Sequence, residues 1–214
     1  MKKLKMMKNK SPGKLITFCG LDGCGKTTLI NDLIADIGNN EIVFLTKQPT
    51  KAVRKSEIFR TYMDCPDHGE FDYRSLSLLA ASDRIQHTNK LIRKKLDEGY
   101  IVISDRYFYS CLANLRARGY KSDKWIYDIA KYLIKPDLAF FLDVSPQTAI
   151  SRVRQRPEEA NSFIDIPLQY RLRQEYVDIC RKNKGILINS SLSEEKCRKT
   201  VKENAERIIK YDHY

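Results

Sequence analysis

The sequence predicts an α/β fold in which a five-stranded parallel sheet carries helices on both faces, forming three layers. Five short apolar runs alternate along the chain with segments that have the apolar spacing of helices. The runs are mostly apolar along their length, which is typical of strands buried between two helical layers. The strands are expected over residues 15–20, 41–46, 100–104, 138–143 and 186–189.

The segments between these runs are bounded by residues that begin or end helices. Gly38 follows the first helix, Pro49 precedes the second, and Gly99 ends a long helix that begins at Tyr73. Ser193 is expected to cap the last helix. Helices are therefore expected over residues 26–37, 52–63, 73–98, 110–118, 123–134, 147–154, 168–182 and 193–210.

The composition indicates one folded domain. The chain has 214 residues, of which 42% are hydrophobic and 31% charged. It contains no apolar run of the roughly 20 residues that a membrane-spanning helix needs. Residues 1–13 are basic, lack the apolar stretch of a signal peptide and are expected to be a disordered tail, followed by a single domain over 14–211. None of the six cysteines forms a CxxC pair, so no zinc site is indicated. Cys24 lies inside the loop at residues 20–28, where a disulfide would be awkward, so the reducing cytoplasm is the expected location.

The net charge of +12 has two explanations. One is binding to nucleic acid. The other is a pocket for nucleotides, which are themselves polyanions. The basic residues are spread along the chain and are not interleaved with aromatic residues as in a groove for single strands. We therefore expect nucleotide substrates and no nucleic-acid partner.

The residues between the first strand and the first helix match the phosphate-loop pattern G-x-x-x-x-G-K-[ST]. Backbone N–H groups of such a turn and the positive end of the helix form a cradle for phosphates. Lys26 is expected to contact the β- and γ-phosphates of ATP. The sequence thus predicts a P-loop NTPase fold, with ATP bound by Gly20, Leu21, Asp22, Gly23, Cys24, Gly25, Lys26, Thr27 and Thr28.

Two residues are expected to hold Mg²⁺, the hydroxyl of Thr27 and the carboxylate of Asp105. Asp105 ends the apolar third strand, as in a Walker B segment. Asp143 at the end of the fourth strand is the competing candidate, but Arg106 directly after Asp105 favours the latter, because one side chain can serve the metal and the next an anionic substrate. Capping of the following helix is the structural alternative for Asp105.

Arginines gather between the sixth predicted helix and a polar loop, at positions 152, 154 and 156. Alternate positions do not share one face of a helix, so at least one of these side chains should point elsewhere. We expect a lid near residues 152–165 in which Arg152, Arg154 or Arg156 stabilises the transferred phosphoryl group. The alternative is a solvated basic helix end that complements the helix dipole.

Arg84 lies in the long helix beside the apolar residues Leu78, Leu79, Ala80 and Ala81. An arginine in such surroundings needs a partner or must reach a cleft. An ion pair with a neighbouring acid is one interpretation. A planar set of donors for a base or a phosphate is the other.

The chain resembles the thymidylate kinases from about Lys14 to Ile209. Four segments carry the resemblance: the loop at 20–28, Thr46-Lys47-Gln48-Pro49, the run Ala81-Ser82-Asp83-Arg84-Ile85-Gln86-His87, and Asp105-Arg106-Tyr107-Phe108-Tyr109-Ser110. The last is the most specific to the family. Arginines in the lid, with none at position 23, are similar to the bacterial type of enzyme.

This resemblance implies a nucleoside monophosphate kinase fold and roles for several residues. Asp22 is implied to lie near the sugar hydroxyl and phosphate of the monophosphate, Arg84 to contact the pyrimidine, and Arg106 to bind the acceptor phosphate. A homodimer is implied as well. The acceptor is thus expected to contact Asp22, Lys47, Arg54, Arg84, Arg106, Tyr107 and Ser110.

The sequence departs from the family at three places. Lys47 stands where an arginine is usual, so a forked phosphate contact becomes a point charge. Ala80 stands where many members have a phenylalanine that stacks on thymine, and Asn114-Leu115 replaces Tyr-Gln. Either other aromatic residues fill the space, namely Phe71, Tyr73 or Tyr109, or the acceptor differs.

The expected function is transfer of the γ-phosphate of ATP to dTMP, forming dTDP, or to a closely related monophosphate. Lys26, Asp22 and the lid arginines are the expected catalytic residues. No general base is expected, because the acceptor is already an ionised phosphate. One alternative is a kinase for a different nucleotide or a nucleoside. The alternative from another class is a nucleic-acid-dependent ATPase or a regulatory NTP-binding protein.

Overall fold

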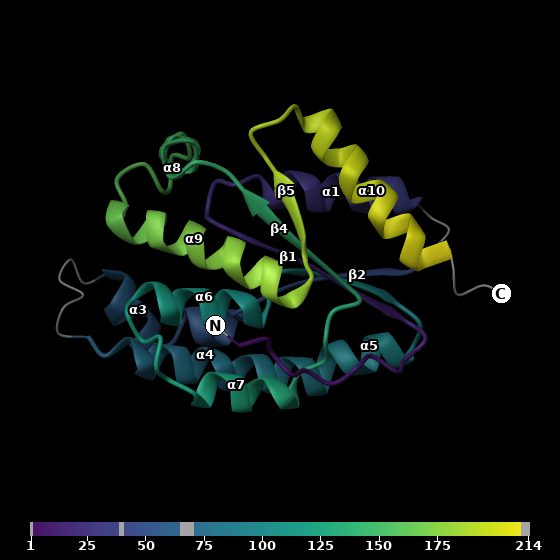
Figure 1. Cartoon of the computed structure of the whole chain (residues 1–214), viewed down its shortest axis with the longest axis horizontal. Coiled ribbons are helices and arrows are strands. Elements are labelled where there is room, and N and C mark those ends of the chain that lie inside the picture. Colours follow the sequence, from purple (N-terminus) through teal and green to yellow (C-terminus); the bar gives the residue numbers. More distant parts are fainter. Residues whose placement is uncertain (1, 39–40, 65–70, 211–214) are drawn as a thin grey trace.

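The computed structural model describes residues 2–38, 41–64 and 71–210 and confirms the predicted α/β architecture. One sheet has the strand order β2-β3-β1-β4-β5, and every neighbouring pair is parallel (Figure 1). The strands are β1 (Lys14–Gly20), β2 (Val43–Lys47), β3 (Ile101–Asp105), β4 (Leu138–Asp143) and β5 (Ile186–Asn189). The bounds of β4 and β5 are those predicted from their apolar runs.

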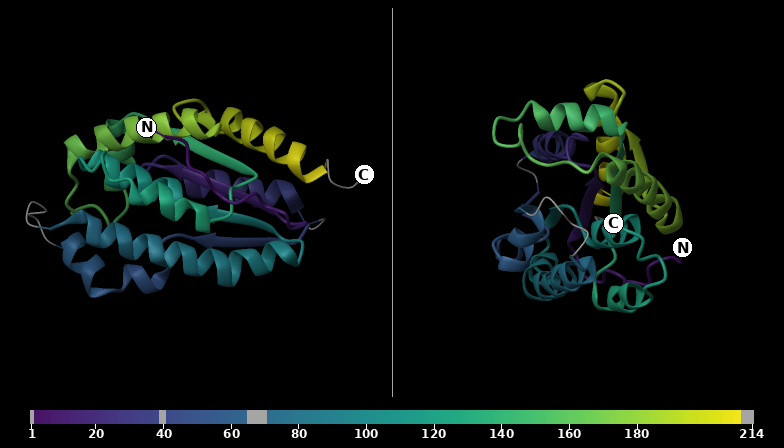
Figure 2. Two further views of the ribbon diagram at one scale, coloured as in Figure 1. Left: turned by 60° about the horizontal axis from the view of Figure 1, so that its bottom comes forward. Right: turned by 90° about the vertical axis from the view of Figure 1, so that its left-hand side faces the viewer.

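Helices cover both faces of this sheet. On one face α1 (Lys26–Ile37) packs against α10 (Glu194–Lys210), and both contact β1. On the other face α6 (Phe108–Ala117) packs against α9 (Ile166–Asn183) and also against α4 (Tyr73–His87). Figure 2 shows these two helical layers from further directions, with the sheet between them.

The interior is built from the faces of the central strands. The rings of Phe18 on β1 and Phe140 on β4 have centroids 5.0 Å apart, and neither is exposed. The strand register sets Phe18 and Lys47 opposite Asp105 on the two sides of β3. The carboxyl ends of β1, β2 and β3 therefore meet at one rim, as the predicted topology requires.

The helix predicted over 52–63 is in fact two, α2 (Lys51–Arg54) and α3 (Glu57–Asp64). Ser56 explains the break. Its hydroxyl donates to the Val53 carbonyl at 2.7 Å and accepts from the Phe59 N–H at 3.3 Å, so it caps the start of α3.

The long helix predicted over 73–98 is continuous but not uniform. It runs through α4, a π-helical turn at Thr88–Ile92 and α5 (Arg93–Asp97). The helix predicted over 123–134 is shorter, with α7 (Trp125–Ile129) followed by a 3₁₀ turn at Ala130–Tyr132. α8 (Pro146–Arg154) begins at Ser145, whose hydroxyl accepts from the Thr148 N–H at 3.1 Å.

The N-terminal segment is packed, which corrects the predicted disorder for residues 2–13. Met7 donates its N–H to the Leu133 carbonyl at 2.9 Å and accepts from the Lys135 N–H at 2.6 Å. Leu4 is 4% exposed, and its N–H donates to Asn183 Oδ1 at 3.0 Å. The many lysines of this segment led to the prediction of disorder, although its apolar side chains anchor it to the domain.

Of the helices in the described part of the chain, none combines the length and apolar composition that crossing a membrane requires.

Candidate functional site

The loop after β1 turns sharply because three of its glycines have positive φ angles. The angles are 147° at Gly20, 79° at Gly23 and 95° at Gly25. A Cβ on Gly23 would lie 2.2 Å from the Ala149 carbonyl oxygen, so a side chain does not fit there. Gly25 precedes α1, and no capping side chain within the described residues occupies that helix start. The first N–H groups of α1 are thus left for an anion.

Lys26 is folded beneath this loop and is 7% exposed. Its ammonium donates to the Leu21 carbonyl at 2.7 Å and to the Gly20 carbonyl at 3.3 Å, and lies 4.0 Å from the Asp22 carboxylate. Thr27, in the first turn of α1, is exposed. The structure therefore gathers the predicted ATP-binding residues into one cradle, with the ammonium inside it.

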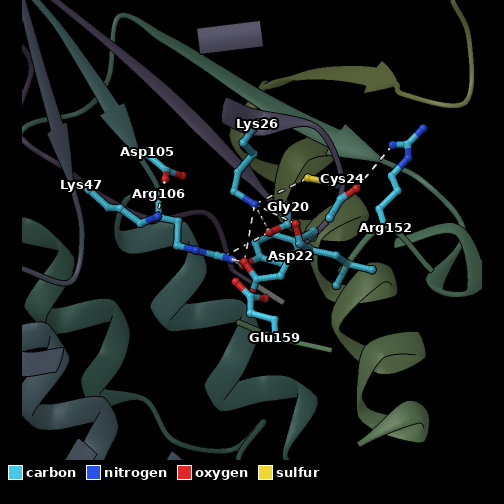
Figure 3. A network of polar contacts seen from close by, with 12 residues as sticks. Gly20, Asp22, Cys24, Lys26, Lys47, Asp105, Arg106, Arg152 and Glu159 are labelled. Carbon is cyan, nitrogen blue, oxygen red and sulfur yellow. Dashed lines mark hydrogen bonds and ion pairs between the residues drawn. The ribbon is translucent and has the colours of Figure 1, made fainter. Parts of the chain in front are cut away.

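Arg106 reaches the same cradle from the end of β3 (Figure 3). Its Nη1 donates to the Gly20 carbonyl at 3.1 Å and to the Tyr176 hydroxyl at 3.2 Å, and its Nη2 forms an ion pair with Asp22. The positive charge of Arg106 holds the pKa of the Asp22 carboxyl well below its usual range. Asp22 is consequently a carboxylate at any physiological pH.

The carboxylate of Asp105 lies beside Lys47, with 2.9 Å between Oδ2 and the ammonium. Its Oδ1 is buried and has no hydrogen-bond partner in the described structure. This side chain does not cap the following helix, because Tyr107 is the N-cap residue of α6 and no side chain caps that helix. Asp143, the competing candidate, has both oxygens held by Arg173, at 2.6 and 2.9 Å. Of these two candidates, Asp105 is thus the one with an oxygen to spare.

The three lid arginines point in different directions, as their spacing predicted. Arg152 Nη1 approaches the Gly23 carbonyl at 3.4 Å. Arg154 instead donates to two carbonyls of the lid itself, Ala160 at 2.5 Å and Ser162 at 2.7 Å. Arg156 pairs with Glu159 at 3.2 Å. Of the three, Arg152 is the one that the described structure places against the phosphate loop.

Two residues of the Asp-Arg-Tyr segment do not face the rim. Tyr107 is fully buried, and its hydroxyl donates to the Ile134 carbonyl at 2.7 Å, so its predicted contact with the acceptor has no open side chain to make it in this structure. Ser110 is 3% exposed, and its N–H donates to the Tyr107 carbonyl at 3.0 Å. Both residues are therefore buried in the described structure.

Arg84 and Arg54 each have a buried guanidinium nitrogen without a partner in the described structure. Arg84 is 3% exposed and donates from Nη1 to the Ala80 carbonyl at 2.9 Å, while its Nε has no partner in the described structure. No carboxylate in the described residues pairs with Arg84. The Nε of Arg54 on α2 is likewise buried and without a partner within the described ranges. These donors leave room for the predicted contacts with base and phosphate.

The rings of Tyr62 on α3, of Phe71, and of Tyr73 on α4 form an aromatic cluster beside Arg118, which follows α6, and sequence reasoning found this cluster only in part. The Arg118 guanidinium lies 3.9 Å from the Tyr73 ring centre and donates to the Tyr62 hydroxyl and to Asn114 Oδ1, both at 2.8 Å. Tyr109 is not part of it, because its ring packs against Phe141 in the core. Arg118 and Tyr176 gave no local signal, since their partners are remote in sequence.

Comparison with known proteins shows the family to which the sequence is similar. The sequence model of the family described as thymidylate kinase matches residues 18–201. A probable thymidylate kinase of Thermococcus kodakarensis is 35% identical over 167 residues, which is 75% of this chain and 80% of that protein. The thymidylate kinase of Onion yellows phytoplasma is 34% identical over 174 residues, 78% of this chain and 83% of its own. A probable thymidylate kinase of Pyrococcus abyssi is 31% identical over 209 residues, 94% and 97% of the two chains.

Proposed function

Because the chain belongs to the thymidylate kinase family, we propose that it transfers the γ-phosphate of ATP to dTMP and forms dTDP. One observation carries the proposal. The arginine of the family's acceptor motif, Arg106, touches the phosphate loop itself through the Gly20 carbonyl at 3.1 Å. The cradle for the donor and the cation for the acceptor are therefore in direct contact, as transfer between two phosphates requires.

On the donor side, the N–H groups of the glycine turn and of the start of α1 would bind the phosphates of ATP. Lys26 would leave the carbonyls of Gly20 and Leu21 and place its ammonium on the β- and γ-phosphates. These groups bind the charge that spreads over the transferred phosphoryl group, so they favour the transition state. No base is needed, because the attacking oxygen already belongs to an ionised phosphate.

On the acceptor side, Arg106 would bind the phosphate of the monophosphate together with Lys47 and Arg54. Asp22 is paired with Arg106 and is 71% exposed at its side chain, so it can exchange that pairing for the sugar hydroxyl. Arg84 would donate to the carbonyl oxygens of the base. These roles follow the family resemblance and are supported by the buried, unpartnered Nε atoms of Arg54 and Arg84.

Mg²⁺ is the metal that this site fits. The Thr27 hydroxyl and the unpartnered Oδ1 of Asp105 are hard oxygen donors, which this ion prefers. No group of three metal-ligating side chains occurs in the described residues, so waters and phosphate oxygens would complete the coordination. When bound, the ion would neutralise charge on the β- and γ-phosphates.

Among the lid arginines, Arg152 is the one we assign to the transition state, because it already approaches the phosphate loop. Arg154 would instead hold the shape of the lid through the carbonyls of Ala160 and Ser162. Arg156 would do so through Glu159.

The cytoplasm is the proposed location, because Cys24 is a free thiol within the phosphate loop and needs a reducing compartment to stay one. A homodimer is proposed from the family resemblance. Light scattering of the purified protein tests it, and a mass of 25.0 kDa, that of one chain, would contradict it.

A coupled assay of ADP release across a panel of nucleoside monophosphates tests the proposed reaction. We expect turnover with dTMP that exceeds turnover with every other member of the panel. Ala80 and Asn114 are the observations that favour a different acceptor, because both remove aromatic rings from the base end. Brisk activity with another monophosphate and none with dTMP would decide for that second candidate.

A further inference from the structure

The guanidinium of Arg106 is held in two different ways at its two ends. Nη1 donates to the Gly20 carbonyl at 3.1 Å and to the Tyr176 hydroxyl at 3.2 Å. Nη2 donates to the carboxylate of Asp22. Gly20 and Tyr176 belong to β1 and α9, and Tyr176 is 4% exposed. Asp22, in contrast, is 71% exposed at its side chain.

The two kinds of partner differ in charge as well as in exposure to solvent. Burial raises the pKa of Tyr176 to about 12, so its hydroxyl is neutral at physiological pH. A neutral acceptor orients a guanidinium without cancelling its charge. The carboxylate of Asp22 neutralises the same guanidinium and competes with a phosphate for it. The Tyr176 hydroxyl can stay in place when an anion arrives, whereas Asp22 must yield.

The backbone at Arg106 is fixed too. Its φ is 69°, which is unusual for a residue with a side chain, and its N–H donates to the Phe18 carbonyl at 2.8 Å. Its own carbonyl accepts from the Ser104 hydroxyl at 2.7 Å. With the backbone held, the remaining freedom lies in the long side chain, and ordering that side chain on binding would cost affinity.

We propose that Tyr176 is a positioning residue of the acceptor site, whose hydroxyl holds Nη1 of Arg106 so that Nη2 faces the phosphate of the monophosphate. The inference rests on the role proposed above for Arg106. Tyr176 does not touch the substrate. It acts by removing, before binding, the side-chain freedom that the phosphate would otherwise have to remove.

The first test is the kinetics of Tyr176→Phe, which deletes one oxygen and keeps the ring. Loss of one hydrogen bond to a charged group weakens binding about tenfold, so we expect KM for dTMP to rise about tenfold. We expect kcat and KM for ATP to stay within about twofold of the natural values. Tyr109→Phe is the matched control, because it removes a buried hydroxyl from a ring that packs against Phe141. Equal changes in KM for dTMP in the two variants would overturn the inference.

The second test is a double-mutant cycle read by calorimetric titration of dTMP, which needs no turnover. Tyr176→Phe should weaken binding about tenfold in the natural protein and have no further effect in Arg106→Ala. The same weakening in both backgrounds would overturn the inference. So would an unchanged affinity in Tyr176→Phe when Arg106→Ala alone binds weakly. An unchanged affinity in Arg106→Ala would instead overturn the role proposed for Arg106, and the inference with it.

Discussion

The donor side of this site is formed largely by main-chain groups, whereas the acceptor side is formed by side chains. The donor side consists of nine consecutive residues, and its phosphate contacts would come largely from main-chain N–H groups. The acceptor side, as we propose it, consists of single side chains from β2, the residue after β3, α2 and α4, namely Lys47, Arg106, Arg54 and Arg84. The first depends on one backbone conformation, and the second on many separate packing relations.

This difference explains where the sequence departs from the family. All three departures, at Lys47, Ala80 and Asn114-Leu115, lie on the acceptor side, whereas the phosphate-loop pattern is intact. A backbone cradle tolerates little change, because a Cβ at Gly23 would meet the Ala149 carbonyl. A side chain on the acceptor side can be exchanged one at a time. We therefore expect substitutions on the donor side to lower kcat and those on the acceptor side to raise KM for the monophosphate.

Lys26→Ala should give the largest effect and tests the donor half of the comparison. We expect kcat to fall by about a thousandfold or more, because the ammonium stabilises charge on the transferred group. A coupled ADP-release assay measures this, and circular dichroism should show an intact fold. Lys199→Ala is the control, as that side chain is 76% exposed on α10. Near-natural turnover in Lys26→Ala would show that the cradle does not need its cation.

The lid arginines give the next largest effect. Arg152→Ala should lower kcat about a hundredfold, as expected for loss of one preorganised donor to the transition state. Arg154→Ala, which loses only carbonyl contacts within the lid, should lower kcat about tenfold or less. Steady-state kinetics of both variants at saturating substrates decide the assignment. The reverse order of effects would move the catalytic role to Arg154.

Lys47→Ala tests the acceptor half. We expect KM for dTMP to rise about tenfold with KM for ATP unchanged, because one charged contact to the acceptor phosphate is lost. Lys47→Arg should restore or improve KM, since the forked donor of the family replaces a point charge. A change in KM for ATP in either variant would show that the two sides are not separable here.

The smallest expected effect is a decrease of the melting temperature of the protein at acid pH, caused by His87 beside β2. His87 accepts or donates at 2.7 Å to the Thr46 hydroxyl, and burial lowers its pKa. The imidazole of His87 therefore becomes protonated near pH 6.5 in the unfolded chain but stays neutral to lower pH in the folded chain. The free energy of unfolding falls as a result when the pH drops from about 6.5 toward 5. We expect the melting temperature to fall by about 2 °C over this range. The same titration on His87→Gln should lack this fall, and an identical fall would exclude His87 as its source.

The same contrast shows what could be predicted from the sequence. The positions of the five strands, the cradle and the Asp105-Arg106 pair depend on local patterns and on the rule that ligands bind at the carboxyl ends of parallel strands. The break at Ser56 was not predicted, because a serine caps a helix only where the neighbouring residues are not helical. The residues on either side of Ser56 give no such signal in the sequence. The contacts of Tyr176 and Arg118 were missed because their partners lie 70 and 56 residues away in the chain.

The left-handed backbone at Arg106 sets stability against activity at a single position. Glycine adopts that conformation without strain, so the backbone geometry alone would favour Gly at this site. The same exchange would remove the cation that recognises the acceptor. Engineering programmes that rank variants by melting temperature should therefore hold this codon fixed, because the enzyme retains a local weakness there in return for its chemistry.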